Sequence, residues 1–304
     1  MKFACVAAVG IVAGITLSVV ASTASAETAY SLTTQVDGDQ AIFKFDTDNL
    51  GLITGGVISG TGGEALADID INPVNNVLYG IGATSGTLYQ IDPVTMTAFV
   101  AVADPAVGTP LDIDFNPVAD RLRIFSTGDQ NYRLTSDAFD NPGLTAGDVT
   151  ADGTLTYATG DTNDGAAPNL VGNAYTNNVN GAATTALYSL DSDLDALILH
   201  SNGPAFSTLN TVASLTLGGN PFDLGELAGF DIATDGIAYV SNNDELYSLD
   251  LTTGALTSIG SIFPFGLSFQ GIAVGDAVAA VPEPSSVVMS LMALTGLLVW
   301  RWRR

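Results

Sequence analysis

The chain has 304 residues, of which 32 are acidic and 8 basic, so its formal net charge at pH 7 is −24. Residues 27–280 are more acidic still, with 31 acidic residues against four basic ones and a net charge of −27. Such a surface repels phosphate backbones, which excludes nucleic acid as a partner. Cys5 is the only cysteine and His200 the only histidine, which excludes intrachain disulfides and metal sites built from several histidines.

The first 26 residues have the three parts of a secretory signal peptide. Lys2 supplies the positive charge, residues 4–20 form the apolar stretch, and Ala24 and Ala26 occupy the small-residue positions that signal peptidase recognises. Cleavage is predicted after Ala26. The protein is therefore expected to be exported, with signal peptidase as its first processing enzyme.

Residues 27–280 are predicted to form one all-β domain that contains an internal repeat. Leu66–Pro73 and Pro110–Pro117 share a Leu/Asp-Ile-Asp pattern and lie 44 residues apart, with looser copies at residues 170–175, 227–232 and 270–274. A second unit, Leu-Tyr followed three residues later by Asp, recurs between these copies. Short strands that repeat every 40–50 residues or so, separated by turn residues, are typical of β-propeller blades.

Five four-stranded blades account for this repeat. Four are expected at residues 64–103, 110–157, 169–217 and 227–262, and the fifth combines residues 270–274 with strands between residues 30 and 58. The mixed fifth blade would pair the N- and C-terminal strands of the domain, which closes the ring and removes an exposed sheet edge. A β-sandwich is the alternative, but it does not explain the repeat.

The repeat places Asp70, Asp114 and Asp231 at equivalent positions of three innermost strands. Three like charges around one axis require solvation, protonation or a bridging cation. Ca²⁺ is the candidate cofactor, because carboxylates are its preferred ligands, and no other cofactor is predicted. The same residues are the candidates for the carboxylate pair of a glycoside hydrolase. The alternative is that each carboxylate only bonds neighbouring backbone.

Three of the domain's four cations, Arg121, Arg123 and Arg133, fall within one blade. They are interpreted as an ion-pair cluster with carboxylates such as Asp120 and Asp129, or as an anion site. No candidate catalytic histidine emerges, because His200 has neither a Gly-x-Ser-x-Gly turn nor a second histidine to act with it. It is interpreted as a structural residue at the end of a strand.

The last 24 residues, 281–304, form a separate sorting segment. Pro282, Glu283 and Pro284 precede an apolar stretch, and the chain ends in a cluster made of Arg301, Arg303 and Arg304. A helix over residues 287–302 would span about 24 Å, and its flanking tryptophans and arginines extend its reach across a bilayer. The arginines would stay on the cytoplasmic side and leave residues 27–280 outside.

This combination of Pro-Glu-Pro, apolar helix and terminal arginines resembles the PEP-CTERM sorting tail. The resemblance implies that a membrane-embedded exosortase recognises and processes the chain on its way to the surface or the extracellular matrix. The domain resembles domain of unknown function family 4394 through Asp114–Arg123, Gly128–Leu134 and Gly229–Ile232. That resemblance implies a propeller-like fold and export, and it assigns no chemistry.

Three functional hypotheses remain open, and the last of them, a purely structural filler of a surface layer, makes no site prediction. The first is a non-enzymatic acidic interaction module of the cell envelope or matrix, membrane-anchored until its tail is processed, with extracellular polysaccharide or a surface protein as ligand. The second is a secreted glycoside hydrolase that uses the axial carboxylates. Carboxyl groups about 5–9.5 Å apart in an open cleft would favour hydrolysis, whereas closed-off, backbone-bonded groups would favour the module.

Overall fold

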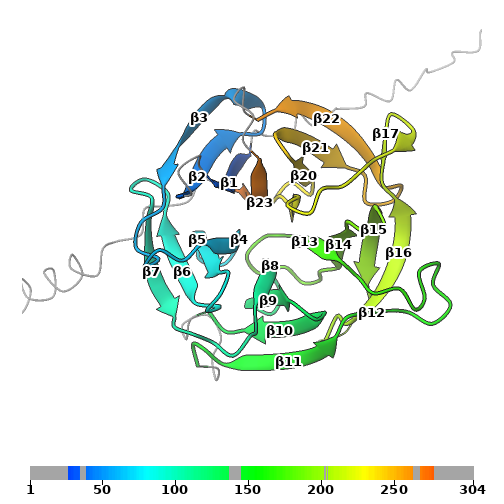
Figure 1. Cartoon of the computed structure of the whole chain (residues 1–304), viewed down its shortest axis with the longest axis horizontal. Helices are drawn as coiled ribbons and strands as arrows, with labels where there is room; N and C mark the ends of the chain where they lie inside the picture. Colours follow the sequence, from blue (N-terminus) through cyan, green and yellow to red (C-terminus); the bar gives the residue numbers. More distant parts are fainter. Residues whose placement is uncertain are drawn as a thin grey trace, which may run out of the picture.

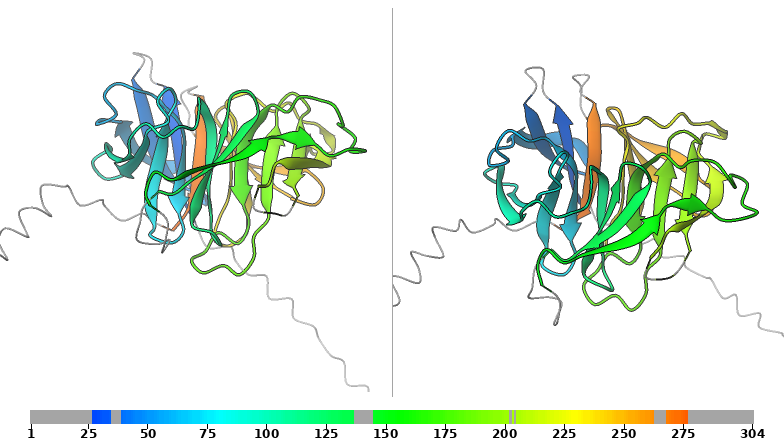
Figure 2. Two further views of the ribbon diagram at one scale, coloured as in Figure 1. Left: turned by 90° about the horizontal axis from the view of Figure 1, so that it is seen from below. Right: turned by 60° about the horizontal axis from the view of Figure 1, so that its bottom comes forward.

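A computed structural model of the chain describes residues 27–34, 39–136, 145–201, 203, 205–262 and 268–276. Within these ranges the chain forms five mainly antiparallel sheets that surround a common axis, as Figures 1 and 2 show. The protein is a five-bladed β-propeller, which confirms the fold predicted from the repeat. The predicted signal peptide and the predicted membrane helix of the tail lie outside the described residues. None of the described residues belongs to a helix that is long and apolar enough to span a bilayer.

Each blade starts with its innermost strand and ends at the rim. Blade 1 contains β4 (Leu66–Asn72), β5 (Val77–Gly82), β6 (Leu88–Asp92) and β7 (Thr97–Val102). Blade 2 contains β8 (Pro110–Asn116), β9 (Arg121–Ser126), β10 (Gln130–Leu134) and β11 (Val149–Thr154). Blade 3 contains β13 (Leu170–Tyr175), β14 (Leu187–Asp191), β15 (Ala196–His200) and β16 (Thr208–Ser214). Blade 4 contains β19 (Gly229–Ile232), β20 (Ala238–Asn242), β21 (Glu245–Leu249) and β22 (Ala255–Ser261).

Blade 5 joins the two ends of the domain. Its innermost strand is β23 (Phe269–Gly275), followed outward by β1 (Thr28–Thr34), β2 (Gln40–Asp46) and β3 (Asn49–Val57). In Figure 1 the orange β23 lies beside the blue β1, and the two strands pair antiparallel with Ala29 opposite Val274. The predicted closure by the N- and C-terminal strands is therefore confirmed, and the ring has no open end between its first and last strands.

Two blade boundaries differ from the prediction. β12 (Thr156–Tyr157) pairs in parallel with β16 of blade 3, and β17 (Thr216–Leu217) pairs in parallel with β22 of blade 4 and carries β18 (Asn220–Pro221). The prediction assigns β12 and β17 to the preceding blades and assigns β18 to none. They change sheets because each connection to the next innermost strand crosses the rim of the next blade, where edge carbonyls are free to accept hydrogen bonds.

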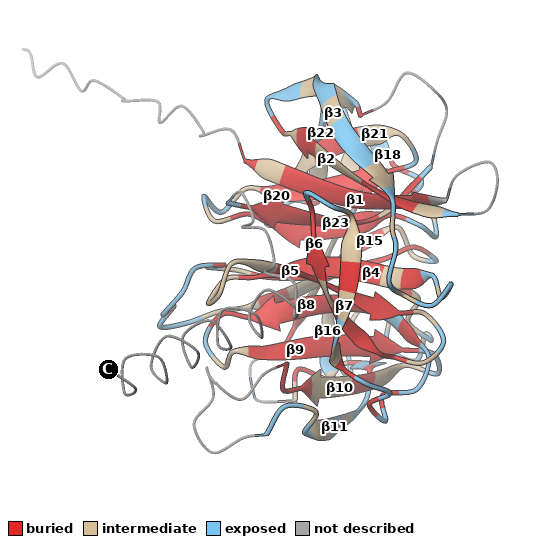
Figure 3. Ribbon diagram, turned by 90° about the vertical axis from the view of Figure 1, so that its left-hand side faces the viewer, coloured by how far each residue is buried: buried red, intermediate tan, exposed pale blue. Residues whose placement is uncertain are grey.

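The hydrophobic core lies between the blades rather than in one central mass. One cluster packs Tyr30 and Leu32 of blade 5 against Ile69 and Ile71 of blade 1, and four further clusters join the other adjacent pairs of blades in the described ranges. Figure 3 shows the resulting gradient, with buried inner strands and an exposed rim strand β3. Each innermost strand therefore packs apolar side chains against the preceding blade, and this fixes the direction of the side chains on its other face.

Candidate functional site

The alternation of side chains along β4 and β8 directs aspartates toward the following blade. In β4, Ile69 and Ile71 pack toward blade 5, so Asp68 and Asp70 must point to the other face, toward blade 2. The same alternation in β8 turns Ile113 and Phe115 back to blade 1 and the two aspartates Asp112 and Asp114 toward blade 3. In both copies of the repeat the aspartates therefore point toward the next blade in the ring.

These aspartates connect the innermost strands to each other. Asp70 Oδ2 accepts a hydrogen bond from the backbone N–H of Phe115 at 2.7 Å, and Asp114 Oδ1 accepts one from Tyr175 N–H at 3.0 Å. Asp68 bonds Ile113 N–H in the same way. The bonds form because the channel side of an innermost strand has no neighbouring strand to satisfy its N–H groups.

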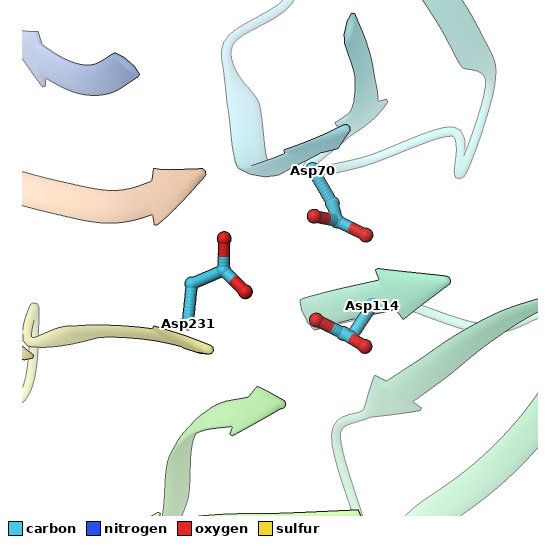
Figure 4. Close-up of side chains that lie close together, drawn as sticks. All are labelled: Asp70, Asp114 and Asp231. Carbon is cyan, nitrogen blue, oxygen red and sulfur yellow. The ribbon is translucent and has the colours of Figure 1, made fainter. Parts of the chain in front are cut away.

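Blade 4 repeats the arrangement toward blade 5. Asp231 of β19 accepts hydrogen bonds from Ile232 N–H at 2.6 Å and from Val274 N–H of β23. Figure 4 shows the carboxyl groups of Asp70, Asp114 and Asp231 pointing toward one another from three different blades. One oxygen of each lies within 4.8 Å of the others, and all three side chains are buried. The structure thus brings together the three residues singled out in the sequence.

Two further carboxylates, Asp68 and Asp112, lie beside these three and were not singled out. Both are buried, and Asp112 accepts a hydrogen bond from the side-chain amide of Asn173 in β13. The signal was present in the sequence, because each precedes a selected aspartate by two residues and so shares its face. We call Asp68, Asp70, Asp112, Asp114 and Asp231 the axial carboxylates.

Burial is the main electrostatic influence on this group. It raises the pKa of Asp68 and of Asp231 to about 7, against the lowering effect of their backbone hydrogen bonds. Burial also raises the pKa of Asp70 and of Asp114, and in both cases the neighbouring carboxylates raise it further. Five like charges cannot coexist unpaired at this depth, so protons or a cation must neutralise part of the cluster.

Cavities lie at both ends of the innermost strands. One of about 350 Å³ is lined by Asp68, Asp112 and Glu226 and by the half-exposed side chains of Leu111 and Leu227. The other, of about 260 Å³, is formed where the strands end, and its lining includes the buried Asn178. Asp70, Asp114 and Asp231 therefore lie between the two cavities and line neither of them, whereas Asp68 and Asp112 line the first.

The arginines of blade 2 form a buried ion-pair network rather than an open cluster. Asp152 receives Arg123 Nη1 at 2.7 Å and Arg133 Nε at 2.6 Å, and the side chains of Arg123 and Asp152 are 1% and 5% exposed. Arg121 donates to the carbonyl oxygens of Arg133 and Asp148. The ion-pair partner is thus a residue that the sequence analysis did not name, because Asp152 lies 29 residues beyond Arg123.

His200 packs inside the interface between blades 2 and 3. Its ring stacks on Phe125 with the centroids 5.4 Å apart, and Nδ1 lies 2.6 Å from the carbonyl oxygen of Phe206. Because a carbonyl only accepts, Nδ1 carries the proton and Nε2 accepts from Ser189 Oγ at 2.7 Å. Burial lowers the pKa of His200 to about 3. This serine–histidine pair is enclosed, which makes it a structural contact and not a nucleophile with its base.

Comparisons with known proteins agree with this architecture. A family model described as "Domain of unknown function (DUF4394)" matches residues 41–273, and one for the PEP-CTERM protein-sorting motif matches residues 280–304. No curated protein matches the chain.

Two solved structures illustrate the similarity in fold. One from the crystal structure of a nidogen/laminin complex has a TM-score of 0.50 at 10% identity, over 82% of this chain and 98% of that one. The other is XC5397 from Xanthomonas campestris, described as a gluconolactonase, with a TM-score of 0.45 at 14% identity over 81% and 79%. At 10% identity the similarity to the first structure concerns the fold alone, and the second structure, with its lower TM-score, carries no argument.

Proposed function

Because the chain belongs to the family described as domain of unknown function DUF4394 and carries a PEP-CTERM motif, we propose that it is a non-enzymatic interaction module of the cell surface or extracellular matrix. The motif indicates an exported, envelope-associated protein that an exosortase processes. The propeller is then the part of the chain that remains outside the cell and binds the ligand.

The enclosure of Asp70, Asp114 and Asp231 is the observation that carries the non-enzymatic role. A glycoside hydrolase needs one carboxyl group that can protonate a glycosidic oxygen and a second that faces the sugar ring. Asp70 and Asp231 each use both carboxylate oxygens for backbone N–H groups, and all of Asp70, Asp114 and Asp231 are at most 2% exposed. A sugar could not reach these groups without the inner strands moving apart.

The ligand surface that we propose is the mouth lined by Leu111, Glu226 and Leu227. Exposed leucines beside a carboxylate provide apolar contact and hydrogen-bond acceptors for a neutral polysaccharide or for a surface protein. The net charge of −27 on residues 27–280 disfavours an anionic polysaccharide unless divalent cations bridge the two.

Co-sedimentation with the extracellular polysaccharide of the host tests this proposal. The full-length chain, purified in a mild detergent, is expected to sediment with the polysaccharide and to leave its length unchanged. Leu227→Ser should weaken binding several-fold, whereas Val94→Ser, an exposed residue in the turn after β6, should not. Shortened polysaccharide would contradict the proposal in favour of the hydrolase, and absence of binding would contradict a polysaccharide ligand in favour of a protein partner.

The sorting step has a separate test in the host. Replacing Pro282, Glu283 and Pro284 together by alanine is expected to leave an unprocessed, larger chain in the membrane fraction. Val281→Ala, immediately before the motif, is the matched control and should be processed normally. Normal processing of the triple variant would contradict the assignment of these residues to the exosortase signal, and release of the unprocessed chain from the membrane would contradict the predicted helix at residues 287–302.

A further inference from the structure

Two buried oxygen atoms of the innermost strands have no hydrogen-bond donor within the described part of the chain. They are Asp68 Oδ1 and Asn173 Oδ1, in side chains that are 5% and 1% exposed. Asp68 cannot turn away freely, because its Oδ2 is bonded to Ile113 N–H. Its Oδ1 lies against Gly271 of β23 in the adjacent blade 5, where a Cβ on this glycine would collide with it. An unpaired buried carboxylate oxygen is costly, so this position calls for a positively charged or donating group.

The spacing of the neighbouring carboxylates fits one ion. Oxygen ligands lie about 2.3–2.6 Å from Ca²⁺, so two ligands on opposite sides of one ion are about 4.6–5.2 Å apart. The oxygens of Asp70, Asp114 and Asp231 lie within 4.8 Å of one another, which places them in the range of a single coordination sphere. Mg²⁺ fits less well, because its bonds of about 2.0–2.1 Å require a tighter octahedron.

The backbone hydrogen bonds do not compete with this role. A carboxylate oxygen has two lone pairs, and after it accepts one N–H it can still bind a cation. The N–H groups of Phe115, Tyr175 and Val274 instead fix the orientation of the three carboxylates before an ion arrives. The cavity lined by Asp68, Asp112 and Glu226 provides an entrance with carboxyl groups on its wall.

We propose that one divalent cation of the Ca²⁺ type binds on the propeller axis, with Asp70, Asp114 and Asp231 as its carboxylate ligands, and that its charge also offsets the unpaired Asp68 Oδ1 two residues before Asp70. The ion ties blades 1, 2 and 4 together at their innermost strands. This site does not depend on the proposed ligand at the cavity mouth, so either proposal can fail while the other holds.

Calorimetry and thermal unfolding of the full-length chain in detergent test the site. After treatment with EDTA, titration with CaCl₂ is expected to give one binding event per chain. At a hundredfold excess over the dissociation constant, Ca²⁺ should raise the unfolding temperature by about 5–10 °C, and NaCl of equal ionic strength should not. An unfolding temperature that is the same in Ca²⁺ and in EDTA would overturn the proposal and leave protons as the neutralising charge.

Asparagine variants separate an ion ligand from a purely structural carboxylate. Asp114→Asn keeps an oxygen for Tyr175 N–H but loses a charge, so we expect Ca²⁺ affinity to fall at least tenfold while the unfolding temperature in EDTA stays equal or rises. Asp231→Asn should show the same changes in Ca²⁺ affinity and unfolding temperature, and it replaces Asp114→Asn in the experiment if that variant fails to fold. Asp250→Asn, in an exposed turn, should leave Ca²⁺ affinity unchanged. Full affinity in both axial variants would overturn the assignment.

Discussion

His200 makes folding sensitive to mildly acidic pH. The native residue, with a pKa of about 3, stays neutral at pH 5, whereas in the unfolded chain a histidine with its ordinary pKa of 6.5 takes up a proton. The unfolded state then binds more protons, so stability falls as the pH falls through 6.5 toward 3. The axial aspartates, with raised pKa values, act in the opposite direction, so the effect must be isolated by substitution.

The substitution His200→Gln isolates the contribution of this histidine to the pH dependence of stability. Between pH 7 and pH 5 the wild-type chain should lose about 2 kcal/mol relative to the variant, because only the wild-type unfolded state gains the histidine proton. Urea unfolding of both proteins at the two pH values measures the difference. An identical pH dependence in the two proteins would mean that native His200 is also protonated at pH 5.

Asp152 is the shared anion of the arginine network. Asp152→Asn leaves Arg123 buried without its charge partner, and we expect the free energy of unfolding to fall by about 3–5 kcal/mol. Asp223→Asn, an exposed residue of the same type, should change it by less than about 0.5 kcal/mol. Denaturant unfolding of both variants is the measurement, and a small loss in Asp152→Asn would show that other acceptors of Arg123, such as Asn131 Oδ1, suffice.

Among the strand elements, β23 depends on a glycine at its irregularity. The pairing of β1 with β23 shifts register between Ser31 and Leu32, and Gly271 opposite this shift has a φ of 62°. This left-handed conformation favours glycine, and the Asp68 carboxylate closes the space beside it. Both effects would oppose a side chain at this position.

Gly271→Ala is therefore expected to cost about 2–4 kcal/mol, as backbone strain and a steric clash combine. Gly62→Ala is the matched control, because Gly62 has a φ of 71° but nothing within 4 Å of its added Cβ, and it should cost about 1 kcal/mol. Urea unfolding compares the two. Equal losses would mean that Asp68 moves aside without cost.

The elements differ in how well the sequence predicts them. The inner strands of blades 1 and 2 were recognisable because burial on both faces selects the same residues in each copy of the repeat. The prediction was wrong for β12 and β17 because a strand of two residues is too short to show a side-chain periodicity. Their partners are decided only by where β16 and β22 lie in the folded ring. The repeat contains Asp68 and Asp112, but the sequence pattern does not show how deeply their side chains are buried.

For the whole molecule, the pairing of β1 with β23 closes the ring by joining the two ends of the domain. Thr28 and Gly275 are direct partners across β1 and β23. In a Cys5→Ser background, Thr28→Cys with Gly275→Cys should form a disulfide under mild oxidation and raise the free energy of unfolding by about 2–4 kcal/mol relative to the reduced form. Single Thr28→Cys is the control, which should show no redox-dependent change. If the double variant fails to form an intramolecular disulfide, the ring is not closed at these strands.

The sequence by itself determined the all-β class, the five blades, the closure and the sorting motif, because each depends on local patterns or on a repeat that a single chain displays. It also selected Asp70, Asp114 and Asp231 from their equivalent places in that repeat. Only the tertiary structure decided that these carboxylates meet within 4.8 Å, bond the next blade and lie enclosed, because residues up to 161 positions apart converge only when the ring closes. The same holds for the arginine network, whose partner is set by the pairing of β10 with β11.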